Sequence, residues 1–442
     1  MLKYVCAVVA VAIVGEVVAK STFPMPRLAT SCTTTVVRRD IVSLSQAEQQ
    51  RFVRVVREMH RRGWMDGFGS MHDHISHQIH GNDQFFAWHR RFLRHFETLM
   101  QEIDPDVVLP YWNWGTYWQN PFVDPVLSST LFGGNGRSGD NCVTDGAEAR
   151  WGRNYPTRNC LTRKFRYGAS TGSFWPMRAV RDVMSSAKTH AQFRSRIENG
   201  AHGIVHLGLG GDFETMWAPV DVLFFLHHAM IDKIWAEWQS RDPQRFEHVD
   251  GYDYARQAIT ADSIMPFYGE DIGSTLATNG PGYCYVYDDL PAPPASLKRA
   301  KVLMAMNAAA NATGSAPRRH PPGPFEPAAP APAPGPVPTL AEPEQPEQPD
   351  PEQLDPAADQ DDGDGDGDGA SEKAAMRLYA KGRDAVQAEA KIVDFAPPQP
   401  MDAGWLRQRH YDVDEAMRMQ QLVDGVVAQI NAERRQNTPG PQ

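Results

Sequence analysis

Histidine is concentrated in one short stretch of this 442-residue chain, and that stretch limits how the chain can fold. Five histidines lie within eighteen residues, and they are His72, His74, His77, His80 and His89. This density is typical of a metal site, in which several imidazoles converge on one ion. Ligation by imidazole alone suits copper, zinc, iron or nickel. The fold must therefore bring these side chains together.

A second histidine group lies farther along the chain. His202 and His206 are four residues apart, so a helix would place both imidazoles on one face. The adjacent pair His227 and His228 follows within another stretch of helical character. Zinc proteases share the four-residue spacing, but they need a glutamate where this chain has Gly203. Three neutral imidazoles per ion would leave positions open for oxygen or a substrate, as an active metal site requires.

The residues that flank the two groups resemble the signatures of a known family. They are Phe85, Trp88-His89-Arg90, Leu226-His227-His228 and Ile231-Asp232-Lys233. Two further motifs are Leu109-Pro110-Tyr111-Trp112-Asn113-Trp114, where the family usually has Asp in place of Asn113, and Tyr285-Val286-Tyr287. Over roughly residues 40–290 the chain resembles the tyrosinase, catechol oxidase and molluscan haemocyanin family of type-3 copper proteins.

The resemblance implies a site with two copper ions and six histidine ligands. The residues at the family's ligand positions are His72, His80 and His89 for the first copper, and His202, His206 and His228 for the second. His74 and His77 match no ligand position, and we interpret them as solvated or supporting histidines. Many family members form a thioether from a cysteine two residues before the second ligand. Gln78 stands there in this chain, so no such crosslink is expected.

The resemblance also implies supporting roles around the ligands. Phe85 is expected to pack against the ligand cage. Arg90 and Asp232 resemble an ion pair that joins two helices beneath the coppers, and the alternative is two exposed charges. Asp221 matches a carboxylate that supports the last ligand, although its neighbours Val220 and Val222 differ from the family's Asn and Pro.

The family's chemistry predicts an enzyme that uses dioxygen and copper to oxidise o-diphenols to o-quinones. Monophenol hydroxylation in the family depends on a glutamate shortly before the first ligand of the second copper and on an asparagine just after that ligand. Glu198 matches the glutamate, with a surface helix carboxylate as the alternative interpretation, and Gly203 replaces the asparagine. We therefore expect phenolic or catecholic substrates, with diphenol oxidation stronger than monophenol hydroxylation, which would be weak or absent.

Two other functions fit the same resemblance. A reversible oxygen carrier usually shields its coppers with an added domain, and no β-rich domain follows the copper core in this sequence. An extracellular-matrix protein with little turnover would suit the acidic C-terminal part of the chain. Both are kept as alternatives to the enzyme.

Helical patterns dominate the first 305 residues. Helices are expected over residues 44–62, 85–103, 176–186, 190–206 and 222–239, with long loops between them and short strands near 284–287. The predicted fold is mainly α, with a four-helix-bundle core that holds the dinuclear copper site. The expected parts are a tyrosinase-like catalytic domain at 20–305, a disordered acidic linker rich in Pro, Ala, Glu and Asp-Gly at 306–372, and a C-terminal helical segment at 373–442.

Residues 1–19 resemble a secretory signal peptide, because Lys3 precedes the apolar run 5–14. We therefore expect a secreted, extracellular protein, and no later apolar stretch is long enough to span a membrane. Removal of the signal leaves four cysteines, which allow three pairings in an oxidising compartment. The pairs that we favour are Cys142–Cys160 and Cys32–Cys284. A glycosylation sequon begins at Asn311.

Acidic residues are concentrated towards the C-terminus. Residues 306–442 contain 23 Asp and Glu against 12 Lys and Arg, and the rest of the chain is close to neutral. No basic face for nucleic acid is therefore expected. The run Asp362, Asp364, Asp366 and Gly367 resembles a calcium loop, but Lys373 replaces the final glutamate. Weak binding of calcium or of a matrix component is one candidate role, and a solvated spacer is the simpler interpretation.

The C-terminal helical segment has a predicted start and a predicted apolar face. Asp412 and Glu415 resemble a capping box, and the residues that can share a face are Val413, Met417, Val426 and Ile430. The segment is either a simple association helix or a cover for the active site, as tails are in latent members of the family. In the second case Trp405 or Phe395 would enter the substrate mouth.

Overall fold

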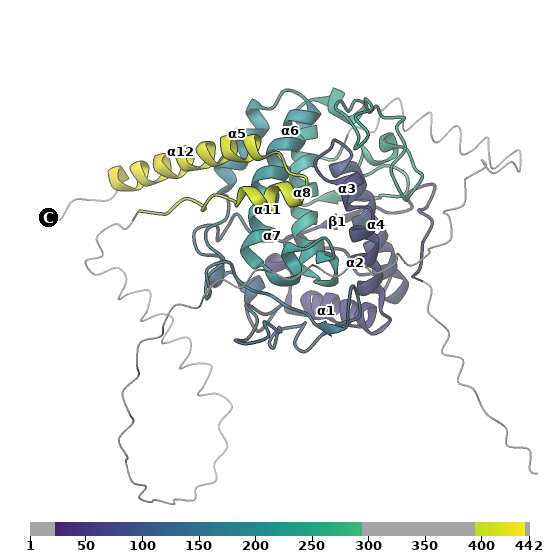
Figure 1. The fold of residues 1–442 in the computed structure, drawn as a ribbon. Helices are drawn as coiled ribbons and strands as arrows, with labels where there is room; N and C mark the ends of the chain where they lie inside the picture. Colours follow the sequence, from purple (N-terminus) through teal and green to yellow (C-terminus); the bar gives the residue numbers. More distant parts are fainter. Residues whose placement is uncertain (1–22, 294–393, 438–442) are drawn as a thin grey trace, which may run out of the picture. The chain divides into compact units, whose positions relative to one another are not determined.

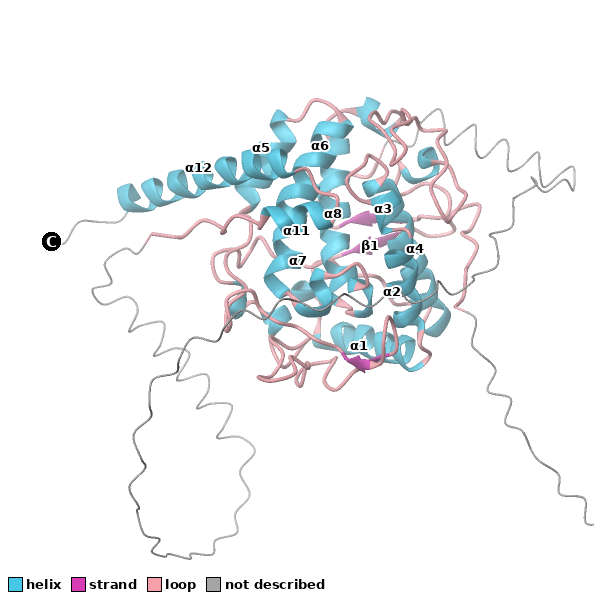
Figure 2. Ribbon diagram, in the orientation of Figure 1, coloured by secondary structure: helices cyan, strands magenta, loops and turns pink. Residues whose placement is uncertain are grey.

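The computed structural model describes residues 23–293 and 394–437, which belong to one compact unit (Figure 1). The expected signal peptide, the acidic linker, the calcium-like run and Asn311 lie outside the described residues. The helices are α1 (Gln46–Arg61), α2 (Trp64–His74), α3 (Ser76–Ile79), α4 (Phe85–Ile103), α5 (Met177–Ser186), α6 (His190–Ile197), α7 (Gly203–Leu209), α8 (Leu223–Ser240), α11 (Ala403–Gln408) and α12 (Val413–Asn437). The strands are β1 (Val36–Arg38), β2 (Gly152–Arg153), β3 (Asn159–Cys160) and β4 (Tyr285–Tyr287). Helices dominate the described chain (Figure 2), which confirms the mainly α prediction.

Most of the helices begin and end close to the residues expected from the sequence. The helix predicted at 85–103 is α4, and those predicted at 44–62, 176–186 and 222–239 are α1, α5 and α8. Ser45 and Glu48 form a capping box that starts α1. The predicted helix at 190–206 is divided, because α6 ends at Ile197 and a π-helical turn, Glu198–His202, precedes α7.

The centre of the fold is the contact between α4 and α8. These two helices pack directly against each other, and α1 packs against both α2 and α4 (Figure 1). Aromatic side chains fill the seam between α4 and α8, where Phe96 stacks on Phe225 at 3.6 Å and Phe86 stacks on Trp235 at 5.2 Å. Burying each such side chain contributes about 1.5–3 kcal/mol. The packing holds the backbone positions from which the histidines converge.

Buried charges reinforce this contact. Asp232 of α8 accepts hydrogen bonds from Arg90 of α4 at 2.5 Å and from Tyr285 and Tyr287 of β4 at 2.5 and 2.6 Å. Arg90 and Asp232 are both buried, so they are not the two exposed charges of the alternative interpretation. Removing one partner would leave the other charge buried and unpaired, so the pair favours a single register between α4 and α8.

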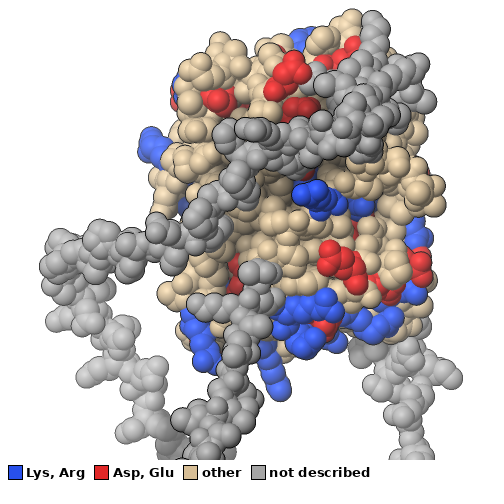
Figure 3. Space-filling model, turned by 90° about the vertical axis from the view of Figure 1, so that its right-hand side faces the viewer, with Lys and Arg blue, Asp and Glu red and all other residues tan. Residues whose placement is uncertain are grey.

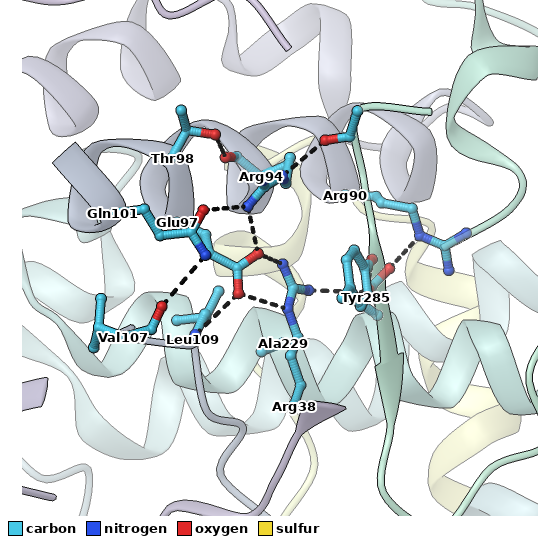
Figure 4. A network of polar contacts seen from close by, with 12 residues as sticks. Arg38, Arg90, Arg94, Glu97, Thr98, Gln101, Val107, Leu109, Ala229 and Tyr285 are labelled. Atoms are coloured by element: carbon cyan, nitrogen blue, oxygen red, sulfur yellow. Dashed lines mark hydrogen bonds and ion pairs between the residues drawn. The ribbon is translucent and has the colours of Figure 1, made fainter. Parts of the chain in front are cut away.

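The two ends of the core domain meet beside this network. Strand β1 pairs in parallel with β4, and Arg38 of β1 is fully buried. Arg38 donates to Glu97 of α4 at 2.8 Å, and Figure 4 shows Glu97 between Arg38 and Arg94. The disulfide Cys32–Cys284 lies just before the two strands. Residues that are far apart in the sequence are therefore tied together beneath the histidines.

The long connection between α4 and α5 is anchored at a second buried cation. Arg163 contacts both Glu148 and Asp221, the latter at 2.7 Å, and all three side chains are fully buried. Asp221 also accepts the backbone N–H of Leu223, so it holds the start of α8 in place. The disulfide Cys142–Cys160 closes part of the same connection. The two disulfides of the described chain therefore confirm the cysteine pairs that we favour from the sequence.

The C-terminal segment packs on the same unit. Helix α12 lies against α5, α6 and the π-helical turn, and its buried residues are Ala416, Met419, Val423, Val426, Val427 and Asn431. The predicted apolar face is wrong at Met417, whose side chain is 54% exposed. The face of α12 that packs on the core instead contains residues 416, 419 and 423. Asn431 bonds the backbone N–H and C=O of Phe395 at 2.8 and 2.9 Å. This contact fastens the extended stretch before α11 to α12.

The described surface carries charges of both signs. Figure 3 shows Lys and Arg side chains alongside Asp and Glu side chains, among mostly uncharged residues. This mixture agrees with the near-neutral composition outside the acidic tail. None of the described helices is long and apolar enough to cross a membrane.

Candidate metal centre

Three histidines from three different elements form the first buried group. His72 lies on α2, His80 follows α3, and His89 is the fifth residue of α4. One ring nitrogen of each lies within 4.8 Å of those of the other two, and all three side chains are buried. The Nε2 atoms of His72 and His89 are 3.3 Å apart. The structure thus brings together the three residues predicted for the first metal.

The second group is built on the π-helical turn and on α8. His202 ends the π-helical turn, His206 lies on α7, and His227 and His228 lie on α8. The four rings offer nitrogens within 4.8 Å of one another. A π-helical turn inserts an extra residue into a helix, and such turns are frequent at functional sites. Here the turn changes the direction in which the His202 side chain points, relative to a regular continuation of α6.

Five of the six predicted ligands use Nδ1 to bond a backbone carbonyl. The pairs are His72–Met216 at 2.5 Å, His80–Ser76 at 3.0 Å, His89–Phe85 at 2.8 Å, His202–Glu198 at 3.3 Å and His206–Phe213 at 2.7 Å. A carbonyl can only accept, so each of these Nδ1 atoms carries the proton and each Nε2 presents a lone pair. Metal-bound histidines are held by the same kind of outer hydrogen bond.

The distances between the Nε2 atoms, which carry the free lone pairs, show whether these residues can bind a metal ion. Nε2 of His206 lies 3.4 Å from Nε2 of His228, and Nε2 of His202 is buried without a hydrogen-bond partner among the described residues. Two nitrogens that are each about 2 Å from one ion at a tetrahedral angle lie roughly 3.3 Å apart. Burial lowers the pKa of His72 and of His206 to about 3, so both rings are neutral, as metal binding requires. The donor set therefore fits two metal ions.

His227 is the residue that sequence reasoning did not place in this site. It is fully buried, its ring lies 5.4 Å from that of His202, and neither of its nitrogens has a hydrogen-bond partner in the described chain. Adjacent helical residues point about 100° apart, so the sequence indicates that only one of His227 and His228 faces a given ion. The second group nevertheless contains both rings, because each of them offers a nitrogen within 4.8 Å of those of His202 and His206.

Phe85 packs between the two groups, as the resemblance implies. Its ring centre is 4.6 Å from that of His89 and 5.0 Å from that of His202. The side chain is fully buried. Phe85 therefore contacts a ring of each histidine group from the first residue of α4.

Glu198 is buried and fully engaged, so it is not the surface carboxylate of the alternative interpretation. One oxygen accepts the backbone N–H of Gly81 at 2.8 Å, and the other accepts from Arg194 at 2.9 Å. Arg194 also donates to Asp83 at 2.8 Å. Burial raises the pKa of Glu198 to about 7, against the opposing effect of Arg194 and of the Gly81 N–H. The carboxylate thus joins the turn that carries His202 to the loop that carries His80.

The C-terminal segment covers the position of Gly203. A Cβ atom at Gly203 would lie 3.0 Å from Sδ of Met401 and 3.5 Å from the ring of Tyr411. The hydroxyl of Tyr411 is 3.4 Å from Nδ1 of His202. Phe395, one of the two side chains expected in the substrate mouth, packs instead against Trp118. Tyr411 is therefore the residue of this segment that reaches the histidines.

A cavity of about 480 Å³ opens beside His80. Its walls are His77, His80, Gly81, Asn82, Asp83, Arg194, Tyr252, Asp253, Tyr254, Arg256, Arg407, His410 and Tyr411. His77 is exposed and lies on this wall, and His74 is exposed and bonds Ser70, so neither joins the two metal groups. Arg407, His410 and Tyr411 are the part of this wall that the C-terminal segment contributes.

A helical core in which histidine alone supplies the donors for two neighbouring ions defines a dinuclear metalloprotein. Comparison with known proteins specifies the class. The model of the common central domain of tyrosinase matches residues 56–241. The chain is 35% identical over 234 residues to a tyrosinase of Streptomyces antibioticus, across 47% of this chain and 84% of that protein. A tyrosinase of Streptomyces glaucescens is 33% identical over 236 residues, with the same coverage.

The chain therefore belongs to the tyrosinase family, whose members have a dinuclear type-3 copper centre. Among solved structures, a polyphenol oxidase from Thermothelomyces thermophila shares the fold with a TM-score of 0.50 and 21% identity, across 57% of this chain and 88% of that one. Family membership indicates a phenol oxidase that uses copper and dioxygen.

Proposed function

We propose that the protein is a catechol oxidase, which oxidises o-diphenols to o-quinones and hydroxylates monophenols weakly or not at all. The observation that carries the proposal is Gly203, which lies beside the buried Glu198, whose oxygens accept from Arg194 and from the Gly81 N–H. Gly203 follows His202 and offers no side chain that could act with this carboxylate. The pair of groups expected to prepare a monophenol for hydroxylation is thus incomplete.

The proposed ligands are the six histidines predicted from the sequence. His72, His80 and His89 would hold one copper, and His202, His206 and His228 the other. When bound, the two ions supply the binding of dioxygen and its reduction by electrons from the diphenol. The protein holds the imidazoles neutral, fixes their tautomer through Nδ1 and, through the apolar ring of Phe85, keeps solvent away from the space between the groups.

Access to the site is the second part of the proposal. Met401 and Tyr411 lie over Gly203, so the C-terminal segment restricts the approach of a phenol in the full chain. This cover favours low turnover until the segment moves, and it is the one observation that supports the alternative of a family member with little turnover. A displaced segment would leave the site open above His202.

Oxygen uptake by the copper-loaded full chain tests the proposal. We expect consumption with 4-methylcatechol to exceed that with 4-methylphenol by at least about tenfold, the effect of one missing transition-state hydrogen bond. A mild detergent that loosens the C-terminal segment should raise the rate of 4-methylcatechol oxidation. The ratio of the 4-methylcatechol rate to the 4-methylphenol rate should change less. Rapid oxidation of 4-methylphenol without a lag and without added diphenol would overturn the assignment as a catechol oxidase.

A further inference from the structure

Tyr411 reaches the histidines from a part of the chain that is distant in sequence. Its hydroxyl lies 3.4 Å from Nδ1 of His202, and its ring meets the imidazole edge-on with the ring centres 6.1 Å apart. Tyr411 is buried. Its hydroxyl contacts Nδ1 of His202 rather than Nε2, and its ring lies against Gly203, so it does not stand between the two histidine groups.

The surrounding contacts hold Tyr411 in this position from both sides. Its backbone N–H donates to Leu406 at 2.9 Å at the end of α11. The next residue, Asp412, donates its N–H to the side chain of Asn199 at 2.8 Å, within the π-helical turn. Arg409 donates to the backbone carbonyl of Glu214 at 2.6 Å. The first of these contacts lies within the segment, and the other two, to Asn199 and Glu214, dock the segment on the core.

Among the five rings that bond a backbone carbonyl, His202 has the longest contact. Its Nδ1 lies 3.3 Å from the carbonyl of Glu198, whereas the other four carbonyl contacts measure 2.5–3.0 Å. Glu198 and His202 are the first and last residues of the π-helical turn. Both contacts of this Nδ1 are long, 3.3 Å to the carbonyl and 3.4 Å to the hydroxyl of Tyr411, so the ring is held by two weak acceptors rather than by one strong one. The hydroxyl of Tyr411 lies where it can accept from the same Nδ1–H.

We propose that Tyr411 is a positioning residue for the second copper. Its hydroxyl oxygen accepts the Nδ1–H of His202 together with the carbonyl of Glu198, and so keeps Nε2 aimed at the metal. The inference rests on the proposed function, in which His202 is a copper ligand. The C-terminal segment then has two effects that oppose each other: it covers the site, and it strengthens the metal centre beneath the cover.

Two substitutions separate these effects. Tyr411→Phe removes the hydroxyl and keeps the ring that covers Gly203, whereas Tyr411→Ala removes both. Loss of an outer hydrogen-bond partner of a metal ligand typically weakens metal binding about 10- to 100-fold. Each variant is loaded with copper as the full chain and dialysed against a series of chelator concentrations, and the retained copper is measured by mass spectrometry. Tyr283→Phe, at another buried tyrosine outside both histidine groups, is the matched control.

We expect Tyr411→Phe to lose one of its two coppers at a chelator concentration about tenfold lower than the parent and the Tyr283→Phe control. X-ray absorption at the copper edge should show greater disorder in the nitrogen shell of Tyr411→Phe. Circular dichroism and thermal melting establish that the variants are folded. Copper retention by Tyr411→Phe equal to that of the parent, with faster 4-methylcatechol oxidation in Tyr411→Ala, would overturn the positioning role and leave only a cover. A parent chain that retains no copper would refute the proposed function instead.

Discussion

Arg194 holds Glu198 inside the wall of the histidine site, with 2.9 Å between the guanidinium and the carboxylate. The same guanidinium lies 2.8 Å from Asp83, and the second oxygen of Glu198 accepts the N–H of Gly81. One buried cation therefore connects the loop after His80 with the turn that presents His202. Glu198, the carboxylate that the family resemblance associates with monophenol hydroxylation, is therefore part of a buried network.

Replacing Arg194 tests how much this network stabilises the fold. Arg194→Met should lower the free energy of unfolding by about 3–5 kcal/mol, because Glu198 and Asp83 would stay buried without their cation. Urea unfolding of the metal-free chain measures the change. Arg181→Met, at an exposed arginine on α5, is the control and should change stability by less than about 0.5 kcal/mol. Equal effects of the two substitutions would show that the network is energetically unimportant.

An asparagine at Gly203 should restore the missing partner of Glu198. The added side chain needs the space that Met401 occupies, so Gly203→Asn is combined with Met401→Ala. We expect the double variant to raise the ratio of 4-methylphenol to 4-methylcatechol oxidation about tenfold over Met401→Ala alone, the worth of one hydrogen bond of about 1.4 kcal/mol. Initial rates of oxygen uptake give both activities. An unchanged ratio would mean that Glu198 cannot serve as a partner while Arg194 holds it.

The second histidine group contains four rings, and copper content distinguishes ligand from neighbour. His228→Ala should retain one of two coppers after dialysis, because Nε2 of His228 lies 3.4 Å from that of His206. His227→Ala should retain both and lose mainly packing energy, about 2–4 kcal/mol for a large buried side chain. Mass spectrometry of copper per chain is the measurement. The reverse result would assign the second copper to His227.

Glu148 should make the fold less stable as the pH rises. Burial and the neighbouring Asp221 raise the pKa of Glu148 well above that of an unfolded chain, and Arg163 only partly opposes this. The native state then holds a proton that the unfolded state has already released, so stability present at about pH 5 is lost towards about pH 8. Thermal melting from pH 5 to pH 9 should show this fall in the parent and a flatter profile in Glu148→Gln. Parallel profiles would show that Glu148 is ionised in the native state.

Much of the helical frame could be predicted because its signals are local. Helix α4 begins and ends where its apolar period does, and α1 starts at a capping box that lies within four residues of sequence. The π-helical turn escaped prediction, since the four-residue spacing of His202 and His206 fits a regular helix equally well. The prediction that Met417 lies on the buried face was wrong for a related reason. More than one face of α12 carries apolar residues, and the packing of α12 against α5 and α6 decides which face is buried.

The flanking motifs around the histidines identified the family and the two-copper site, because metal ligation restricts residue type and spacing strongly. The supporting residues were harder to find. Arg38 is fully buried and bonded to Glu97, yet nothing in the sequence distinguishes it from its neighbour Arg39, which is not fully buried. Arg194 is similar, since its partner Asp83 is 111 positions away.

The sequence by itself determined a mainly α chain with six histidines in two groups, because helix periodicity and ligand spacing are properties of short segments. Only the tertiary structure decided that His227 joins the second group and that Glu198 is held by Arg194. It also decided that Tyr411 contacts His202, although 209 positions separate the two residues. Contacts of this kind depend on how whole helices dock, and docking is set by the burial of many side chains together.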